Sequence, residues 1–166
     1  MRNKQEIFLE LYESNRDRIY RICHYYVPNK GLVNDLFQDI FLNVWKNIDS
    51  FRNEAKINTW IYRIAINTSI SFARFSSNER DKYKNMEEAY YSNIPDQEES
   101  NEDTEMLFKL LYQGIAQLPI VDRTIISLFL EDLSYKEIAE ISKISEDNLR
   151  VRIHRIKKKL KIFSKD

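Results

Sequence analysis

The sequence predicts an all-α protein made of two small helical domains joined by an acidic linker. Glycine occurs only twice and proline three times in 166 residues, so the chain lacks the frequent tight turns of a β-rich protein. Apolar residues recur at intervals of three and four over long stretches, which is the spacing of amphipathic helices. The 43% apolar and 31% charged residues are typical of a well-packed soluble protein.

Three or four helices are expected in the first half of the chain, and three of them can be delimited. The first covers about residues 4–26 and is ended by Pro28 and Gly31. The second covers about residues 32–48, with apolar residues on one face and acids and amides on the other. A loop follows, and the third helix runs from about residue 59 to residue 75.

An acidic block separates the two halves. Residues 85–105 carry eight Asp or Glu and no Lys or Arg, with weak apolar periodicity. We therefore divide the chain into domains at 1–78 and 104–166, with a flexible linker at 79–103. The composition favours a loose connection between the domains. Considered alone, the block is interpreted as a linker between the domains or as a solubilising tether.

Four helices are expected in the second half. One covers about residues 104–117, and the next runs to about Glu131, with Pro119 in its first turn. The last two cover about 135–141 and 145–162. Ser134 with Glu137 caps the first of them, and Ser145 caps the second. A three-residue turn joins these two helices, so together they predict a helix-turn-helix.

The last helix has the pattern of a DNA recognition helix. Leu149, Ile153 and Ile156 form an apolar stripe, and residues 143–166 have a net charge of +6. Recognition helices place their N-terminal half in the major groove, where arginine pairs with guanine and asparagine with adenine. The candidate DNA-binding residues are Asn148, Arg150, Val151, Arg152, His154, Arg155 and Lys158. The alternative is an ordinary basic helix that faces solvent.

Two stretches resemble conserved regions of one protein family. VNDLFQDIFLNVWKNIDSFRNEAKINTWIYRIAIN (33–67) is similar to the second conserved region of the sigma-70 family, in its extracytoplasmic-function (ECF) branch. LPIVDRTIISLFLEDLSYKEIAEISKISEDNLRVRIHRIKKKL (118–160) is similar to the fourth conserved region. The order of the two regions matches, and a linker separates them. The resemblance implies an RNA polymerase sigma factor that recognises the −10 and −35 promoter elements and initiates transcription of a specific regulon.

The resemblance also implies roles for individual residues. The face that docks on a coiled coil of core RNA polymerase would be Asp35, Gln38, Asp39 and Asn43. The residues that open the −10 element and hold its melted non-template strand would be Phe51, Arg52, Asn53, Glu54, Ala55, Lys56, Trp60, Arg63 and Asn67. Considered alone, Phe51 and Trp60 are better explained as core residues. For Arg63, the alternative to a contact with nucleic acid is an internal salt bridge.

The last helix would read the −35 duplex, and an anti-sigma factor is the further partner that the resemblance implies. The sequence departs from the family pattern at two positions that are usually glycine. Asn53 tolerates a left-handed backbone, but a left-handed Lys143 costs about 1 kcal/mol. These departures bear on the exact promoter preference, not on the class of protein.

Two other classes of protein fit the sequence less well. A helix-turn-helix regulator that binds DNA without docking on core polymerase would use the same last helix, but would not need the Asp35 face. An enzyme is disfavoured because no phosphate loop, metal-ligand cluster or nucleophile–base pair is present; Cys23 and His24 are adjacent on a helix and point about 100° apart. We expect no cofactor, no metal and no small-molecule substrate. With no apolar span or leader pattern, the expected location is cytoplasmic, without membrane insertion.

Overall fold

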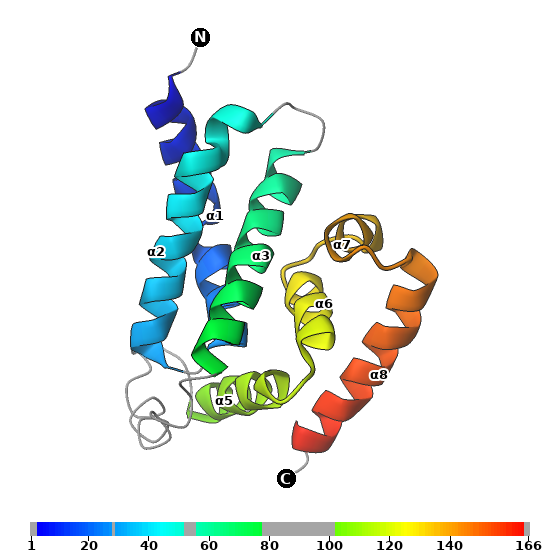
Figure 1. Cartoon of the computed structure of the whole chain (residues 1–166). Coiled ribbons are helices and arrows are strands. Elements are labelled where there is room, and N and C mark those ends of the chain that lie inside the picture. The colour runs from blue at the N-terminus through cyan, green and yellow to red at the C-terminus, as the bar shows by residue number, and fades with distance from the viewer. Residues whose placement is uncertain (1–2, 28, 52–55, 78–101, 165–166) are drawn as a thin grey trace.

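The computed structural model describes residues 3–27, 29–51, 56–77 and 102–164 (Figure 1). Within these ranges every regular element is a helix and no strand occurs, which confirms the predicted fold class. Most of the expected acidic linker, and four residues of the predicted loop at 52–55, lie outside the described residues.

Three helices form the front unit, residues 3–77. They are α1 (Lys4–Tyr26), α2 (Lys30–Asn47) and α3 (Ile57–Ser77), with a short 3-10 turn at Ile48–Ser50 after α2. Each of the three helices contacts the other two. Their shared core includes Ile19, Leu36 and Ile61, which are fully buried. The apolar spacing therefore predicted the helices correctly, and α3 begins two residues before its expected start because Ile57 joins its first turn.

Four helices form the back unit, residues 102–164. They are α5 (Glu102–Ala116), α6 (Ile120–Leu130), α7 (Tyr135–Ser142) and α8 (Glu146–Ser164). Pro119 is the N-cap of α6, one position before the expected first turn, with φ −54° and ψ 153°. The extended backbone at that residue ends the preceding turn. Proline is tolerated there because the N–H group that it lacks would have no acceptor within the helix.

The two helices of the helix-turn-helix, α7 and α8, have the expected N-terminal caps. The Ser134 hydroxyl accepts from the Glu137 N–H, and the Glu137 carboxylate accepts from the Ser134 N–H, so the capping box is present. At the other end of α7, Lys143 has φ 64° and ψ 23° in the left-handed region. Ser145 then accepts from the Asn148 N–H and caps α8. The turn therefore keeps the geometry that glycine usually provides.

The two units pack against each other, which differs from the loose connection expected from the linker composition. Helix α1 contacts α5 and α6, and α3 contacts α7. In Figure 1, α2 and α8 lie on opposite sides of the molecule. Tyr26, at the end of α1, is 1% exposed and its hydroxyl is hydrogen-bonded to Thr124 on α6. Linker composition carries no information about such contacts, because they depend on the faces that the helices present.

Arg123 on α6 reinforces the same contact. Its side chain is 6% exposed, and its Nη2 donates to the carbonyl oxygens of Ala116 at 2.7 Å and Leu118 at 3.1 Å. Its Nη1 is 3.5 Å from the carbonyl oxygen of Tyr26. A buried guanidinium needs such acceptors, because burying a charge without hydrogen bonds is strongly unfavourable. Arg123 thus ties the start of α6 to both units.

Candidate functional site

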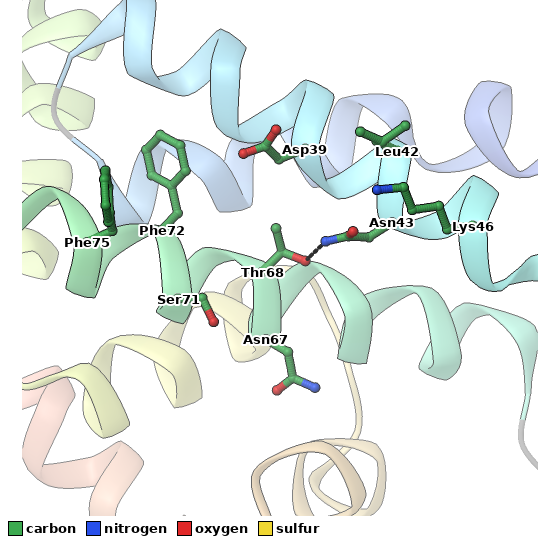
Figure 2. A pocket seen from close by; sticks show the side chains of 9 residues that line it. All are labelled: Asp39, Leu42, Asn43, Lys46, Asn67, Thr68, Ser71, Phe72 and Phe75. Atoms are coloured by element: carbon green, nitrogen blue, oxygen red, sulfur yellow. Dashed lines mark hydrogen bonds between the residues drawn. The ribbon is translucent and has the colours of Figure 1, made fainter.

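The outer face of α2 brings together three of the four predicted polymerase-docking residues. Asp35, Gln38 and Asp39 are all exposed. Gln38 and Asp39 follow Asp35 by three and four residues, so all three lie on one side of the helix. Asn43 lies differently. It is half-buried, and its Nδ2 donates to the Thr68 hydroxyl on α3 at 3.0 Å, so its amide joins α2 to α3 (Figure 2).

An open groove of about 650 Å³ runs between α2 and α3 beside this face. Leu42 and Lys46 extend from α2, and Phe72 and Phe75 extend from α3 (Figure 2). Leu42 is 50% exposed and Phe75 is 71% exposed, so the groove presents uncovered apolar surface. These residues were missed in the sequence analysis. An apolar leucine on the polar face of the second helix was the signal that could have found them.

Asn67, predicted to contact DNA, lines the same groove as Asp39 and Asn43. It is exposed on α3, seven residues after Trp60. The structure therefore separates Asn67 from the aromatic end of the predicted DNA site and places it beside the docking face.

The aromatic end of that site lies where the chain enters α3. The ring centroids of Phe51 and Trp60 are 5.3 Å apart, and both side chains are half-buried. Phe51 also lines a second hollow of about 560 Å³, together with residues of α1 such as Leu11 and Asn15. Lys56 is exposed beside it. Arg52, Asn53, Glu54 and Ala55 lie outside the described residues.

Arg63 is half-buried on α3. Its Nε is buried and has no hydrogen-bond acceptor among the described residues. Because α3 contacts α7, the back unit covers part of the helix that carries Arg63. An arginine nitrogen that is buried without an acceptor leaves an unused donor on the predicted melting helix.

Helix α8 places the predicted DNA-binding residues on its outer surface. Leu149, Ile153 and Ile156 are at most 2% exposed and face the back unit. The seven predicted residues are all exposed: Asn148, Arg150, Val151, Arg152, His154, Arg155 and Lys158. The fold therefore presents a basic helix surface next to a helix-turn-helix turn, which suits the phosphates and the major groove of duplex DNA.

Two arginines of this surface are held by neighbouring side chains. Nη1 of Arg150 lies 3.4 Å from the Asp147 carboxylate, and the guanidinium lies 5.3 Å from the centroid of the Tyr135 ring on α7. Nη1 of Arg152 lies 3.2 Å from the Asp122 carboxylate on α6. One arginine is thus drawn towards α7 and the other towards α6. Sequence reasoning missed Tyr135 and Asp122, because both are distant in sequence from α8.

Cys23 and His24 do not form a reactive pair. Burial raises the pKa of the Cys23 thiol to about 12. Burial, with a smaller contribution from Lys30, lowers the pKa of His24 to about 4. Both groups are therefore neutral near pH 7, which is the opposite of a thiolate–imidazolium pair. In the described ranges no group of three or more His, Cys, Asp or Glu could hold a metal ion.

The chain matches two family models, one in each unit. Residues 11–79 match the sigma-70 region 2 model, and residues 108–160 match the sigma-70 region 4 model. The chain is 34% identical over 161 residues to the ECF RNA polymerase sigma factor SigW of Bacillus subtilis, covering 91% of this chain and 85% of that protein. This chain is an ECF sigma factor of the sigma-70 family.

Other relatives of this sigma factor agree. It is 32% identical to the ECF RNA polymerase sigma-E factor of Escherichia coli K12, covering 91% of this chain and 83% of that protein. The solved structure of CnrH in complex with the cytosolic domain of CnrY has a TM-score of 0.71, with 18% identity, over 97% of this chain and 89% of that one. At this level of identity the likeness concerns the fold alone.

A second solved structure is similar in fold. The sigma factor RpoE of Bartonella quintana, in complex with the anti-sigma factor NepR, has a TM-score of 0.68 with 18% identity, over 97% of this chain and 98% of that one. Sigma factors are transcription initiation factors rather than catalysts. Among the helices described for this sigma factor, none is both long and apolar enough to cross a membrane.

Proposed function

We propose that this sigma factor docks on core RNA polymerase with its front unit, opens the proximal promoter element with α3, and reads the distal element with α8. The proposed domains are 1–78 and 104–166, joined by a linker at 79–103. Initiation at a specific set of promoters is the function that follows. The observation that carries this proposal is the presence of an acid-and-amide face on α2 and a basic helix-turn-helix face on α8, on opposite sides of one chain.

The docking face combines polar and apolar chemistry. Asp35, Gln38 and Asp39 can accept charge-assisted hydrogen bonds from arginines of a partner. The groove beside them, with Leu42 and Phe75 exposed on its walls, can bury apolar side chains of that partner. Charged groups at the rim then orient the partner while the apolar groove contributes most of the affinity.

Melting of the proximal element is assigned to the junction of the loop and α3. Separating bases costs about a few kcal/mol per step, and aromatic stacking with basic groups offsets that cost. Phe51, Trp60 and Lys56 supply these groups at the start of α3. Arg63 would supply its unused donor, and residues 52–55 would complete the loop.

We also propose that an anti-sigma factor regulates this protein. Of the two solved proteins of similar fold, RpoE is in complex with the anti-sigma factor NepR, and CnrH is in complex with the cytosolic domain of CnrY. The proposed place of action is the cytoplasm, where core polymerase and promoter DNA are found. The chain itself would be non-enzymatic: the chemistry of initiation would belong to the polymerase, and Cys23 with His24 supplies no activated nucleophile.

The test mixes the purified full chain with bacterial core RNA polymerase and follows complex formation by size exclusion. The variant D35A/Q38A/D39A should co-elute more weakly than the wild type. The matched control changes an amide and two acids on α1, Q5A/E13A/D17A, all exposed, and should co-elute like the wild type. If the triple variant co-elutes like the wild type, Asp35, Gln38 and Asp39 do not form the docking face.

A further inference from the structure

One apolar side chain lies in the middle of the basic surface of α8. Val151 is 50% exposed, although the residues around it on the outer surface are charged or polar. Val151 is the exposed large apolar residue on the part of α8 whose side chains the structure describes. It is the sixth residue of the helix, in the N-terminal half that recognition helices bring against base edges.

Helix geometry places Val151 directly away from the core. With 100° per residue, it lies about 140–160° around the axis from Leu149, Ile153 and Ile156. These three residues are buried against the back unit. The side chain at 151 is therefore near the centre of the outer surface, and not at its edge where a valine could be covered by α6 or α7.

The flanking arginines leave this position open. Arg150 is held towards α7 by Tyr135 and paired with Asp147, and Arg152 is paired with Asp122 on α6. Both guanidinium groups therefore have partners that lie away from Val151. Arg155, one turn further on the same side, remains exposed beside it.

The chemistry of valine selects one kind of base contact. A valine side chain neither donates nor accepts hydrogen bonds, so it cannot recognise the polar edges that guanine, cytosine and adenine present in the major groove. Thymine differs because it presents a C5-methyl group there. A valine pressed against a polar edge would leave that edge desolvated without a partner, which is unfavourable.

We propose that Val151 reads the C5-methyl group of a thymine in the distal promoter element. This inference rests on the proposed function, because it requires that α8 lies in the major groove. It makes Val151 a specificity-determining residue, with a role distinct from the arginines and lysines that contact phosphates or guanine. Loss of one buried methyl contact should weaken binding about fourfold.

The experiment uses the full chain bound to core RNA polymerase and duplexes with a randomised distal element. The preferred sequence is selected first. Each thymine in it is then replaced in turn by deoxyuridine, which removes only the methyl group. At one position the wild type should lose about fourfold in affinity, and V151A should bind the thymine and deoxyuridine duplexes equally. V121A is the matched control, because Val121 on α6 is 48% exposed, and it should keep the wild-type sensitivity.

The outcomes separate this inference from the function on which it rests. If no sequence is enriched, α8 does not read duplex DNA, and the proposed function fails together with the inference. If a sequence is enriched but no deoxyuridine substitution weakens binding, or if V151A keeps the full sensitivity, the inference alone is overturned. Replacing an exposed valine by alanine favours the helix, so a folding defect would not explain the loss of methyl sensitivity.

Discussion

Arg21 on α1 and Glu131 at the end of α6, 110 positions apart, are joined by two parallel hydrogen bonds. Nε and Nη2 of Arg21 each lie 2.9 Å from a carboxylate oxygen of Glu131. The Glu131 side chain is 3% exposed, whereas that of Arg21 is 46% exposed. The hydrogen bond to Glu131 raises the pKa of Arg21 above its usual value. This pair fastens the front unit to the back unit.

Replacing Arg21 with alanine should open the contact between the units. Glu131 would then be a buried carboxylate without its bidentate partner, which costs about 2 kcal/mol. The free energy of unfolding in urea should fall by about that amount. The radius of gyration from small-angle X-ray scattering should also rise, because exposing Glu131 to water requires α1 to move away from α6.

A matched control exists on the same helix. Arg16 pairs with Asp17 on the surface, with exposed fractions of 52% and 85%, so R16A should change neither quantity. The exchanged pair R21E/E131R should recover part of the loss. An R21A protein with wild-type radius and stability would show that the pair does not hold the units together.

The stability of the contact should fall in acid because of His24. Its ring lies 5.7 Å from that of Tyr112 on α5 and 4.8 Å from that of Tyr20. Burial lowers its folded pKa from 6.5 to about 4, so the unfolded chain takes up a proton first as the pH falls. Stability from neutral His24 is complete above pH 6.5 and is lost towards pH 4, by up to about 1.4 kcal/mol per pH unit.

The measurement is urea unfolding at several pH values between 7 and 4, for the wild type and for H24F. Phenylalanine keeps the aromatic contacts but cannot take up a proton. The difference in unfolding free energy between the two proteins should therefore change across this range. Parallel pH profiles of the two proteins would show that His24 does not contribute to the acid sensitivity.

The left-handed Lys143 predicts a simple stabilising substitution. A lysine with φ 64° crowds its Cβ against its own backbone, whereas glycine has no Cβ. K143G should therefore stabilise the protein by about 0.5–1 kcal/mol. E140G, at an exposed position past the first turn of α7, should destabilise it by about 1 kcal/mol, because glycine there only adds unfolded-state freedom. Thermal unfolding of the two variants checks the opposite signs.

The hydrogen bond from Asn43 to Thr68 should contribute stability and little direct binding. N43A and T68A should each destabilise the protein, with a coupling of about 1 kcal/mol in a double-mutant cycle. The N43A variant should bind core polymerase more tightly than the D39A variant, because Asp39 is exposed to a partner whereas Asn43 is half-buried. A coupling near zero would mean that the amide has no role in joining α2 to α3.

The helices and their ends could be predicted because their causes are local. Apolar residues three and four apart must share a face, and a serine followed three residues later by a glutamate completes a capping box. These rules located α7 and α8, the buried stripe at Leu149, and the exposed surface that carries Arg155. The left-handed turn at Lys143 was also visible in the sequence, as a lysine where glycine is usual.

Other features could not be predicted, because no short-range spacing encodes them. Asp132 also adopts a left-handed backbone, with φ 63°, directly after the buried Glu131, and no local pattern signalled it. Asn43 reads as one more polar residue on an exposed face until α3 brings Thr68 to it. The groove at Phe75 lies between α2 and α3, and its shape depends on how the side chains of the two helices pack.

The sequence by itself determined that the chain is helical, where each helix runs, and which helix carries the basic surface. The tertiary structure decided that the front and back units pack together, through Arg21 with Glu131 and Tyr26 with Thr124. The physical reason is the range of the interactions. Helix formation is specified by neighbours within four residues, whereas a contact between residues about a hundred positions apart depends on how all the intervening helices pack.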